Sequence, residues 1–215
     1  MNLEKGIHQE VIEAKINKDS NAPIKTRVNT FPLNSGGANF KTHKLVKNSL
    51  SKVSFKPTVL VILFCLCFFI IGLGVFSYSL FGTAFPEDSK WLVSLFGVVF
   101  TLIGVLLFYF FTKPRVFNKT INLYYKSFTS KNVSKSKHSK SLSDIVAIQI
   151  IGEVIQSDNS SYNSFELNLV LNDASRINVI DHGNLKSIIE DAQYLSEFLN
   201  VPIWHASSHL EDYNK

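Results

Sequence analysis

The hydrophobic residues of this chain are concentrated in two long runs. The first covers residues 59–81 and the second covers residues 91–111, and neither contains a charged side chain. A helix as long as the first run rises about 34 Å, which is enough to cross a hydrocarbon core of roughly 30 Å. A buried helix of that length in a soluble protein would need a much larger chain around it. Both runs therefore predict transmembrane helices.

The segment between the two runs is short and contains a helix breaker. It reads GTAFPEDSK, with Pro86 near its centre. So short a connection makes the two helices antiparallel neighbours. Basic side chains flank the pair on its outer sides, at Lys44, Lys47, Lys52, Lys56, Lys113, Arg115 and Lys119. By the positive-inside rule we expect both termini in the cytosol.

After the second run the apolar positions change to an alternating pattern, which is typical of β-strands. Two short strands are predicted within residues 115–128, around an Asn-containing turn at 119–122. Further strands are predicted at residues 142–156, 164–173 and 175–181. In the segment 164–173, apolar residues and more polar residues take opposite faces, because successive side chains of a strand point to opposite sides.

The pattern changes again near the C-terminus, where apolar residues recur at helical spacing. The stripe consists of Leu185, Ile188, Ile189, Ala192, Leu195, Phe198 and Leu199. Asn184 suits the N-cap, Asn200 suits the position after the helix, and Pro202 blocks its extension. Strands followed by one amphipathic helix predict an α+β domain, in which the helix caps a small antiparallel sheet or half-barrel.

These patterns divide the chain into four regions. Residues 1–57 are polar and predicted to be partly disordered on the cytosolic side, with a turn at Gly36-Gly37 and a short strand near the membrane. Residues 58–112 form the transmembrane hairpin, residues 113–204 the cytosolic β-rich domain, and residues 205–215 a tail. Whether the first 57 residues join the β-rich domain stays open.

Charge is distributed unevenly along the chain, and this suggests a partner. Residues 113–140 carry eight basic side chains and no acid, whereas residues 141–215 carry three basic and eleven acidic ones. Anionic lipid head groups attract such a belt, although it also serves as an orientation signal. Nucleic acid is not expected, because no aromatic interleaving or known module accompanies the charge. The candidate lipid-facing residues are Lys113, Arg115, Lys119, Lys131, Lys135, Lys137 and Lys140.

Other residue types capable of chemistry are sparse. Asp181 and His182 are adjacent and could supply a general base, but no nucleophile motif accompanies them. His205 and His209 have a spacing that a helical metal site could use, yet they fall in the predicted tail. Cys65 and Cys67 lie within the first apolar run, where packing is the expected role. No cofactor is expected.

The order of elements resembles two families. Two spans followed by RVFNKTINLYYKSF, SLSDIVAIQI, FELNLVL and IIEDAQYLSEFLNVPIW are similar to photosystem I assembly proteins, over residues 58–204. This chain departs from their pattern at Asn118, where an acid would be expected. It also resembles uncharacterised two-span bacterial inner-membrane proteins with pleckstrin-homology-like cytosolic domains. The resemblance implies an architecture and a scaffolding role, without photosynthetic function, since no residue looks like a pigment ligand.

Three functions stay open from the sequence. The leading hypothesis is a non-enzymatic scaffold or assembly factor that sits in the bilayer and presents its cytosolic domain to another membrane protein. The alternative is a module that senses anionic lipid or another signal through the basic belt. An enzyme that uses Asp181 and His182 is the least favoured, because two adjacent residues do not make a site.

Overall fold

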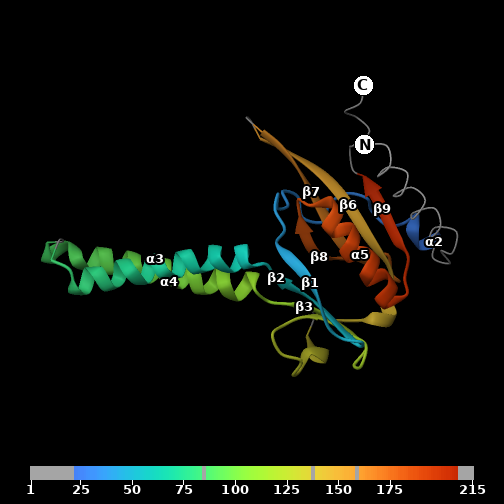
Figure 1. Ribbon diagram of the computed structural model, residues 1–215, viewed down its shortest axis with the longest axis horizontal. Coiled ribbons are helices and arrows are strands. Elements are labelled where there is room, and N and C mark those ends of the chain that lie inside the picture. The colour runs from blue at the N-terminus through green and yellow to red at the C-terminus, as the bar shows by residue number, and fades with distance from the viewer. Residues whose placement is uncertain (1–21, 84–85, 137–138, 158–159, 208–215) are drawn as a thin grey trace. The chain divides into compact units, whose positions relative to one another are not determined.

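The computed structural model describes residues 22–83, 86–136, 139–157 and 160–207 and divides the chain into two units (Figure 1). One unit is a helical hairpin, Lys56–Pro114. The other unit is rich in β-strands and combines Met1–Phe55 with Arg115–Lys215. The helical hairpin is therefore inserted into the sequence of the sheet-rich unit.

The helical hairpin consists of helix α3 (Val59–Phe81) and helix α4 (Glu87–Phe111). Both helices are long and apolar enough to cross a membrane. The bounds of α3 are those predicted from the sequence, whereas α4 begins four residues before residue 91. Pro86 precedes this earlier start, and Glu87 and Asp88 lie in the first turn, where carboxylates interact favourably with the helix dipole.

Small residues hold the two helices close together. A Cβ atom on Gly72 would overlap the backbone of Thr101, and one on Gly104 would overlap the backbone of Phe69. The hydroxyl groups of Ser79 and Ser94 lie 2.8 Å apart and form a hydrogen bond between the helices. Small side chains and such hydrogen bonds are what associate helices in an apolar environment, where burial itself gives little drive.

The sheet-rich unit contains two sheets. The five-stranded sheet has the order β1-β2-β3-β4-β5. Its strands are β1 (His43–Ser49), β2 (Lys52–Pro57), β3 (Arg115–Asn118), β4 (Leu123–Lys126) and β5 (Lys140–Ser141). The predicted turn between β3 and β4 is confirmed, and Asn122 takes a positive φ of 52° there, which asparagine tolerates better than most residues.

The four-stranded sheet has the order β8-β7-β6-β9. Its strands are β6 (Ile145–Ser157), β7 (Ser160–Leu171), β8 (Arg176–His182) and β9 (Ile203–Ser207). Pairs β6–β7 and β7–β8 are antiparallel, and β9 pairs with β6 in parallel. The described residues of this unit also contain three short helical segments: α2 (Ala22–Lys25), η1 (Val133–Lys135) and η2 (Leu142–Asp144).

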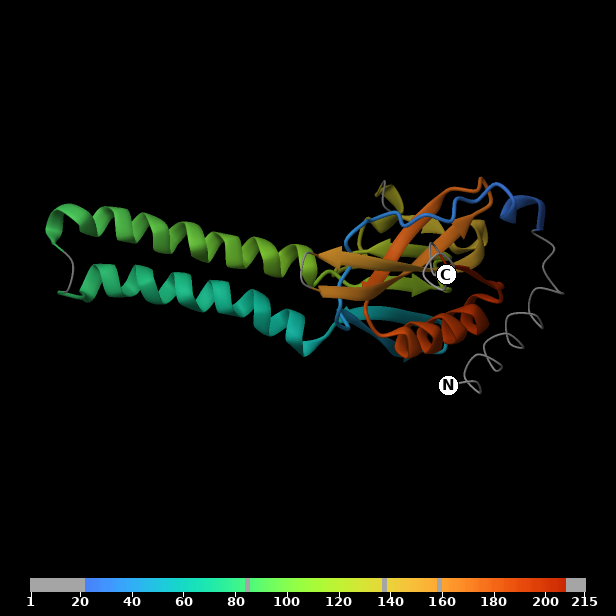
Figure 2. The same cartoon turned by 90° about the horizontal axis from the view of Figure 1, so that it is seen from above.

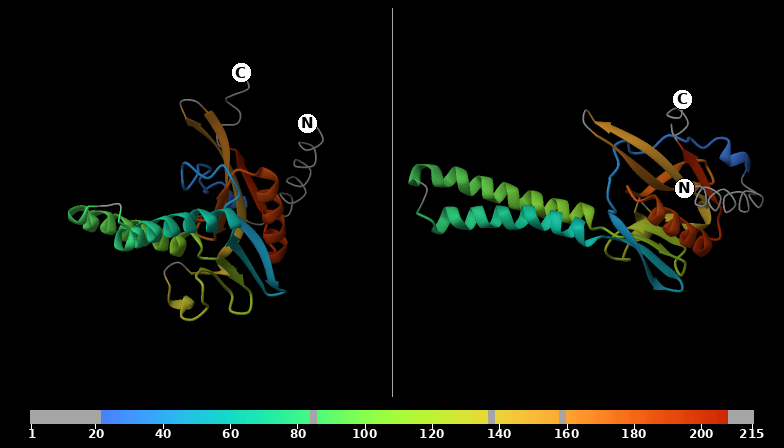
Figure 3. Two further views of the ribbon diagram at one scale, coloured as in Figure 1. Left: turned by 60° about the vertical axis from the view of Figure 1, so that its left-hand side comes forward. Right: turned by 45° about the horizontal axis from the view of Figure 1, so that its top comes forward.

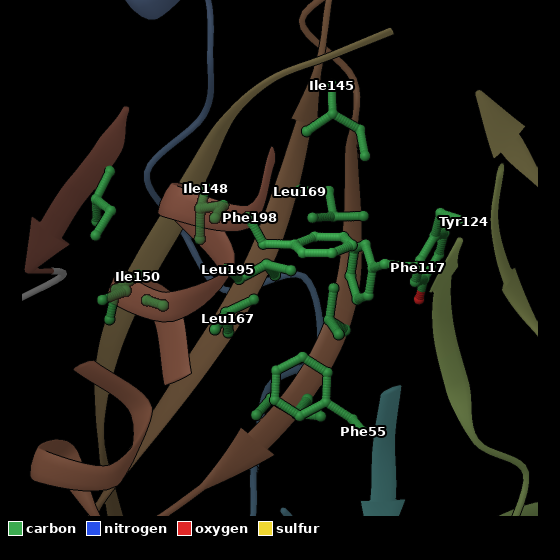
Figure 4. Close-up of a cluster of buried hydrophobic side chains, with 14 of the residues drawn as sticks. Phe55, Phe117, Tyr124, Ile145, Ile148, Ile150, Leu167, Leu169, Leu195 and Phe198 are labelled. Atoms are coloured by element: carbon green, nitrogen blue, oxygen red, sulfur yellow. The ribbon is translucent and has the colours of Figure 1, made fainter. Parts of the chain in front are cut away.

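Helix α5 (Leu185–Leu199) packs on the four-stranded sheet through the predicted stripe. The side chain of Asn184 caps it by accepting from Ser187 N, and Asn200 ends it at a φ of 58°. Ile188, Ala192 and Leu195 are fully buried. Residues of both sheets and of α5 form one hydrophobic core, in which Phe55 of β2 and Leu167 of β7 belong to the same cluster as Leu195 (Figure 4).

The structure answers one question that the sequence left open and moves one predicted boundary. Strands β1 and β2 belong to the sheet-rich unit, so part of residues 1–57 joins the domain expected at residues 113–204. At the other end, the chain expected to form a tail from residue 205 continues β9 to Ser207. Strand β9 is short and pairs in parallel with the distant strand β6, which local patterning does not reveal.

Leu195→Asp should destabilise the sheet-rich unit by at least about 3 kcal/mol, because it removes a fully buried side chain and introduces an unpaired charge. Leu185→Asp is the matched control, since Leu185 lies on the same helix and is 37% exposed. Thermal unfolding and protease resistance of the detergent-solubilised chain would measure both. Equal behaviour of the two variants would show that α5 is not packed on the sheet as described.

Candidate interaction surface

A polar face of the four-stranded sheet lies opposite α5. On β7, Phe165, Leu167 and Leu169 point into the core, whereas Glu166 and Asn168 point to the other face, as the alternation predicts. Glu166 and Asn168 are nevertheless buried, at 3% and 0% exposure. A buried carboxylate needs hydrogen-bond donors, and the N-terminal segment supplies them.

The segment that covers this face is residues 29–40, called the strap below. It runs over the sheet on the side away from α5 (Figures 2 and 3). Just before it, Val28 packs with Ala147, Val170 and Trp204 in a second small hydrophobic cluster. The sheet is therefore covered on both faces, by α5 on one and by this N-terminal segment on the other.

The strap is fastened mainly by its main chain. Glu166 accepts hydrogen bonds from Leu33 N at 2.9 Å and from Asn34 N at 2.7 Å. Further side chains of the sheet bond to the strap's backbone as follows: Glu153 to Gly36 N, Gln149 to Asn29 O, Tyr162 to Gly37 O, Ser164 to Ala38 O and Arg176 to Phe31 O. The sheet therefore holds the strap through hydrogen bonds to its peptide groups.

The predicted turn at Gly36-Gly37 lies where the strap bends over the sheet. Gly36 has a φ of 83°, in the left-handed region that favours glycine. A Cβ atom on Gly37 would overlap the hydroxyl of Ser164. Gly36 is therefore favoured by its backbone conformation, and Gly37 by its close approach to Ser164.

Large apolar side chains of the strap face solvent. Phe31 is 57% exposed and Leu33 is 41% exposed. Because hydrogen bonds of the main chain attach the strap to the sheet, the positions of these two side chains are fixed. Neighbouring exposed apolar groups on an ordered segment are typical of a protein contact site.

The basic residues singled out in the sequence are distributed over several settings. Lys113 Nζ lies 3.7 Å from the ring centroid of Tyr109, and Lys119 Nζ lies 4.6 Å from that of Phe198. Lys131 is exposed in the loop between β4 and β5 (residues 127–139, the basic loop). Lys135 belongs to η1, Lys140 belongs to β5, and Lys137 lies outside the described residues.

Arg115 is placed differently from the other basic residues. Its guanidinium donates to Nε2 of His43, and its pKa is lowered by burial, an effect that Tyr124 and Asp181 oppose. The same Tyr124 is fully buried, and burial raises its pKa to about 12. Arg115 is thus engaged within the sheet-rich unit, where a bulky lipid head group has little access to it.

Asp181 and His182 take opposite faces of β8, as neighbours on a strand must. Asp181 accepts from Asn178 Nδ2 at 2.6 Å, and burial raises its pKa to about 6. His182 has no exposed surface, and burial lowers its pKa to about 4. The structure therefore does not bring the two side chains together as an acid–base pair.

The remaining candidates are also separated. His205 lies in β9, whereas His209 lies outside the described residues. Cys65 is buried and Cys67 is exposed, which fits two positions that do not share a helix face. Sequence reasoning missed the strap, although the glycine pair marks the place where it bends over the sheet.

Comparison of the chain with known proteins gives no relative. No family model, curated protein or solved structure matches it. The resemblances to photosystem I assembly proteins and to pleckstrin-homology-like domains therefore remain expectations drawn from the sequence.

Acid should weaken the fold through His182. Its pKa is about 4 in the folded protein against 6.5 ordinarily, so between these values the unfolded chain binds a proton that the folded chain does not. Its contribution to stability is therefore present above pH 6.5 and is lost as pH falls toward 4. Asp181 and Asp191, whose pKa values burial raises to about 6, act in the opposite direction.

The comparison that isolates this effect is wild type against His182→Gln. Thermal unfolding of the solubilised full chain, measured from neutral pH down to about pH 4.5, should show wild-type stability falling relative to the variant. The two aspartates are common to both proteins and cancel in the difference. A difference that does not change with pH would contradict a neutral, buried His182.

Proposed function

We propose that this protein is a non-enzymatic membrane scaffold or assembly factor, anchored by the helical hairpin, whose strap contacts another membrane protein. The proposal has two parts, an anchor and a contact surface. The anchor tethers the sheet-rich unit to a bilayer, and the strap presents exposed apolar side chains. Each part rests on its own observations.

The anchor is supported by the length and composition of α3 and α4 and by their exposure. Apart from the N-terminal turn of α4, the side chains that these helices present outward are apolar. Phe55 and Arg115 pair in the antiparallel ladder between β2 and β3, so the chain leaves the five-stranded sheet at β2 and returns to it at β3. An even number of membrane crossings likewise requires the two ends of the hairpin to lie on one side of the membrane. The basic flanks favour the cytosol for this side, in a bacterial inner membrane by the resemblance stated above.

The contact surface is supported by the way in which the strap is held. Binding an unstructured segment costs conformational entropy at each residue that becomes ordered. The hydrogen bonds that Leu33 N and Asn34 N donate to Glu166 offset this entropy loss during folding. A partner would then find Phe31 and Leu33 already positioned, at 57% and 41% exposure. This preorganisation is the observation that carries the scaffold role.

The double variant Phe31→Ser, Leu33→Ser should abolish capture of the partner without unfolding the protein. Burial of two such side chains accounts for at least about 3 kcal/mol, so recovery should fall more than tenfold. The measurement is crosslinking in native membranes followed by purification of the intact chain and quantification of the captured protein. Thermal unfolding of the variant should match wild type.

The matched control is Leu50→Ser, because Leu50 is 100% exposed and lies in the turn between β1 and β2, outside the strap. Its captured protein should equal that of wild type. If the strap variant recovers as much partner as this control does, the strap is not the contact surface.

A second candidate function is attraction of the basic loop to anionic lipid. Phe128 is 57% exposed, and Lys131 is exposed in the same loop. Lysines beside an exposed aromatic ring are typical of segments that lie at a membrane interface. Surface attraction of this kind decays over a Debye length of about 8–10 Å, so it should depend on salt.

The full chain reconstituted in nanodiscs tests this second function. In bilayers that contain phosphatidylglycerol, Lys131 should react with an amine-acylating reagent several-fold more slowly than in pure phosphatidylcholine. Salt at about 0.5 M should remove the difference. Lys186, which is exposed on α5, is the internal reference. Replacing Lys131, Lys135, Lys137 and Lys140 by Gln should make backbone hydrogen exchange in the basic loop equally fast in both bilayers. Equal labelling of Lys131 in both bilayers would remove the lipid function of the loop.

A further inference from the structure

The helical hairpin carries an apolar groove of about 210 Å³ between its two helices. Three residues of α3 and three of α4 line it: Cys65, Leu66, Phe69, Gly104, Val105 and Phe108. Gly104 and Phe69, which both line the groove, are in close contact across the two helices. Its walls are hydrocarbon, sulfur and aromatic surface without a charged group.

The groove lies near the end of the hairpin at which α3 begins and α4 ends. Cys65 is six residues after Val59, the first residue of α3, and Val105 is six residues before Phe111, the last residue of α4. Six residues of helix span about 9 Å. In a bilayer this depth corresponds to the upper part of the acyl chains of one leaflet, below the head groups.

A positive charge lies just beyond the end of α4 to which the groove is near, at Lys113. Tyr109 follows Val105 by four residues, which places the two side chains one above the other on the helix surface. Lys113 Nζ lies 3.7 Å from the centroid of the Tyr109 ring and 5.5 Å from that of Phe110. The ammonium group is therefore folded back over the aromatic residues that follow the groove, instead of extending away from the helix.

We propose that the groove binds one acyl chain of an anionic phospholipid, whose phosphate contacts Lys113. The inference rests on the membrane anchor of the proposed function, but not on the strap or its partner. The groove supplies hydrocarbon surface at acyl-chain depth, and Lys113 supplies the complementary charge at head-group depth. A helix of a second copy would fill the groove too, but it would leave the ammonium group above it without an anion.

Native mass spectrometry of the detergent-purified full chain tests the site, with phosphatidylglycerol or phosphatidylcholine of identical acyl chains added. Wild type should retain one phosphatidylglycerol about fivefold more tightly than phosphatidylcholine, as expected for one basic residue near a head group. Val105→Phe fills the groove and should weaken binding of both lipids about tenfold. Lys113→Gln should remove the preference for phosphatidylglycerol, because that preference comes from attraction between the lysine and the lipid's net negative charge.

Two matched controls make the result specific. Val99→Phe adds the same ring on the same helix at nearly equal exposure, 46% against 47% for Val105, but outside the groove. Lys90→Gln removes a lysine that lies in the first turn of α4, far along the helix from the groove. Both variants should bind lipid as wild type does.

Several outcomes would overturn the proposal. These are equal binding of the two lipids by wild type, equal losses with Val99→Phe and Val105→Phe, or a dimer mass that Val105→Phe converts to a monomer, which would assign the groove to a second copy. Alkaline extraction of membranes provides the separate check on the anchor. Release of the wild-type chain into the soluble fraction would contradict the anchor itself, whereas retention with no lipid preference would contradict only this site.

Discussion

The burial of Glu166 is the constraint on which the sheet-rich unit depends. A carboxylate with 3% exposure must be satisfied by donors, and the two consecutive backbone N–H groups of Leu33 and Asn34 satisfy it. This requirement fixes where the N-terminal segment lies, and it buries the second face of β7. Strand β7 can then be covered on both sides in a small protein, by apolar packing against α5 and by hydrogen bonds to the strap.

The two faces of this sheet are therefore covered by two kinds of chemistry. On the α5 side, side chains of the helix and of the sheet are buried together in the hydrophobic core. On the strap side, hydrogen bonds to peptide groups make the attachment, and the side chains of Phe31 and Leu33 are 57% and 41% exposed. In the proposed function, substitution at these two positions would change the contact surface, whereas substitution at Glu166 would also remove the attachment of the strap.

Sequence reasoning succeeded where local signals determine the structure. The charge-free runs predicted both long helices, and the stripe around Leu195 predicted α5. Asn122 and Asn200 indicated a turn and a helix end, and both residues have a positive φ. It did not find the strap or β9, because each is held by residues more than 50 positions away, such as Leu33 by Glu166 and Ile203 by Ile148. Lys131 could be recognised as exposed from its polar surroundings, whereas the engagement of Arg115 with His43 depends on the fold.

The pairing of β2 with β3 has a consequence for biosynthesis. The helical hairpin separates these neighbouring strands in sequence, although Phe55 and Arg115 face each other in the ladder. On the ribosome, β1 and β2 emerge first and can pair with each other, but the other edge of β2 has no partner until α3, α4 and β3 have been made. Maturation of the sheet must therefore wait for translation of the hairpin. A chain truncated between the two helices would expose an unpaired strand edge, which quality-control proteases and chaperones can recognise.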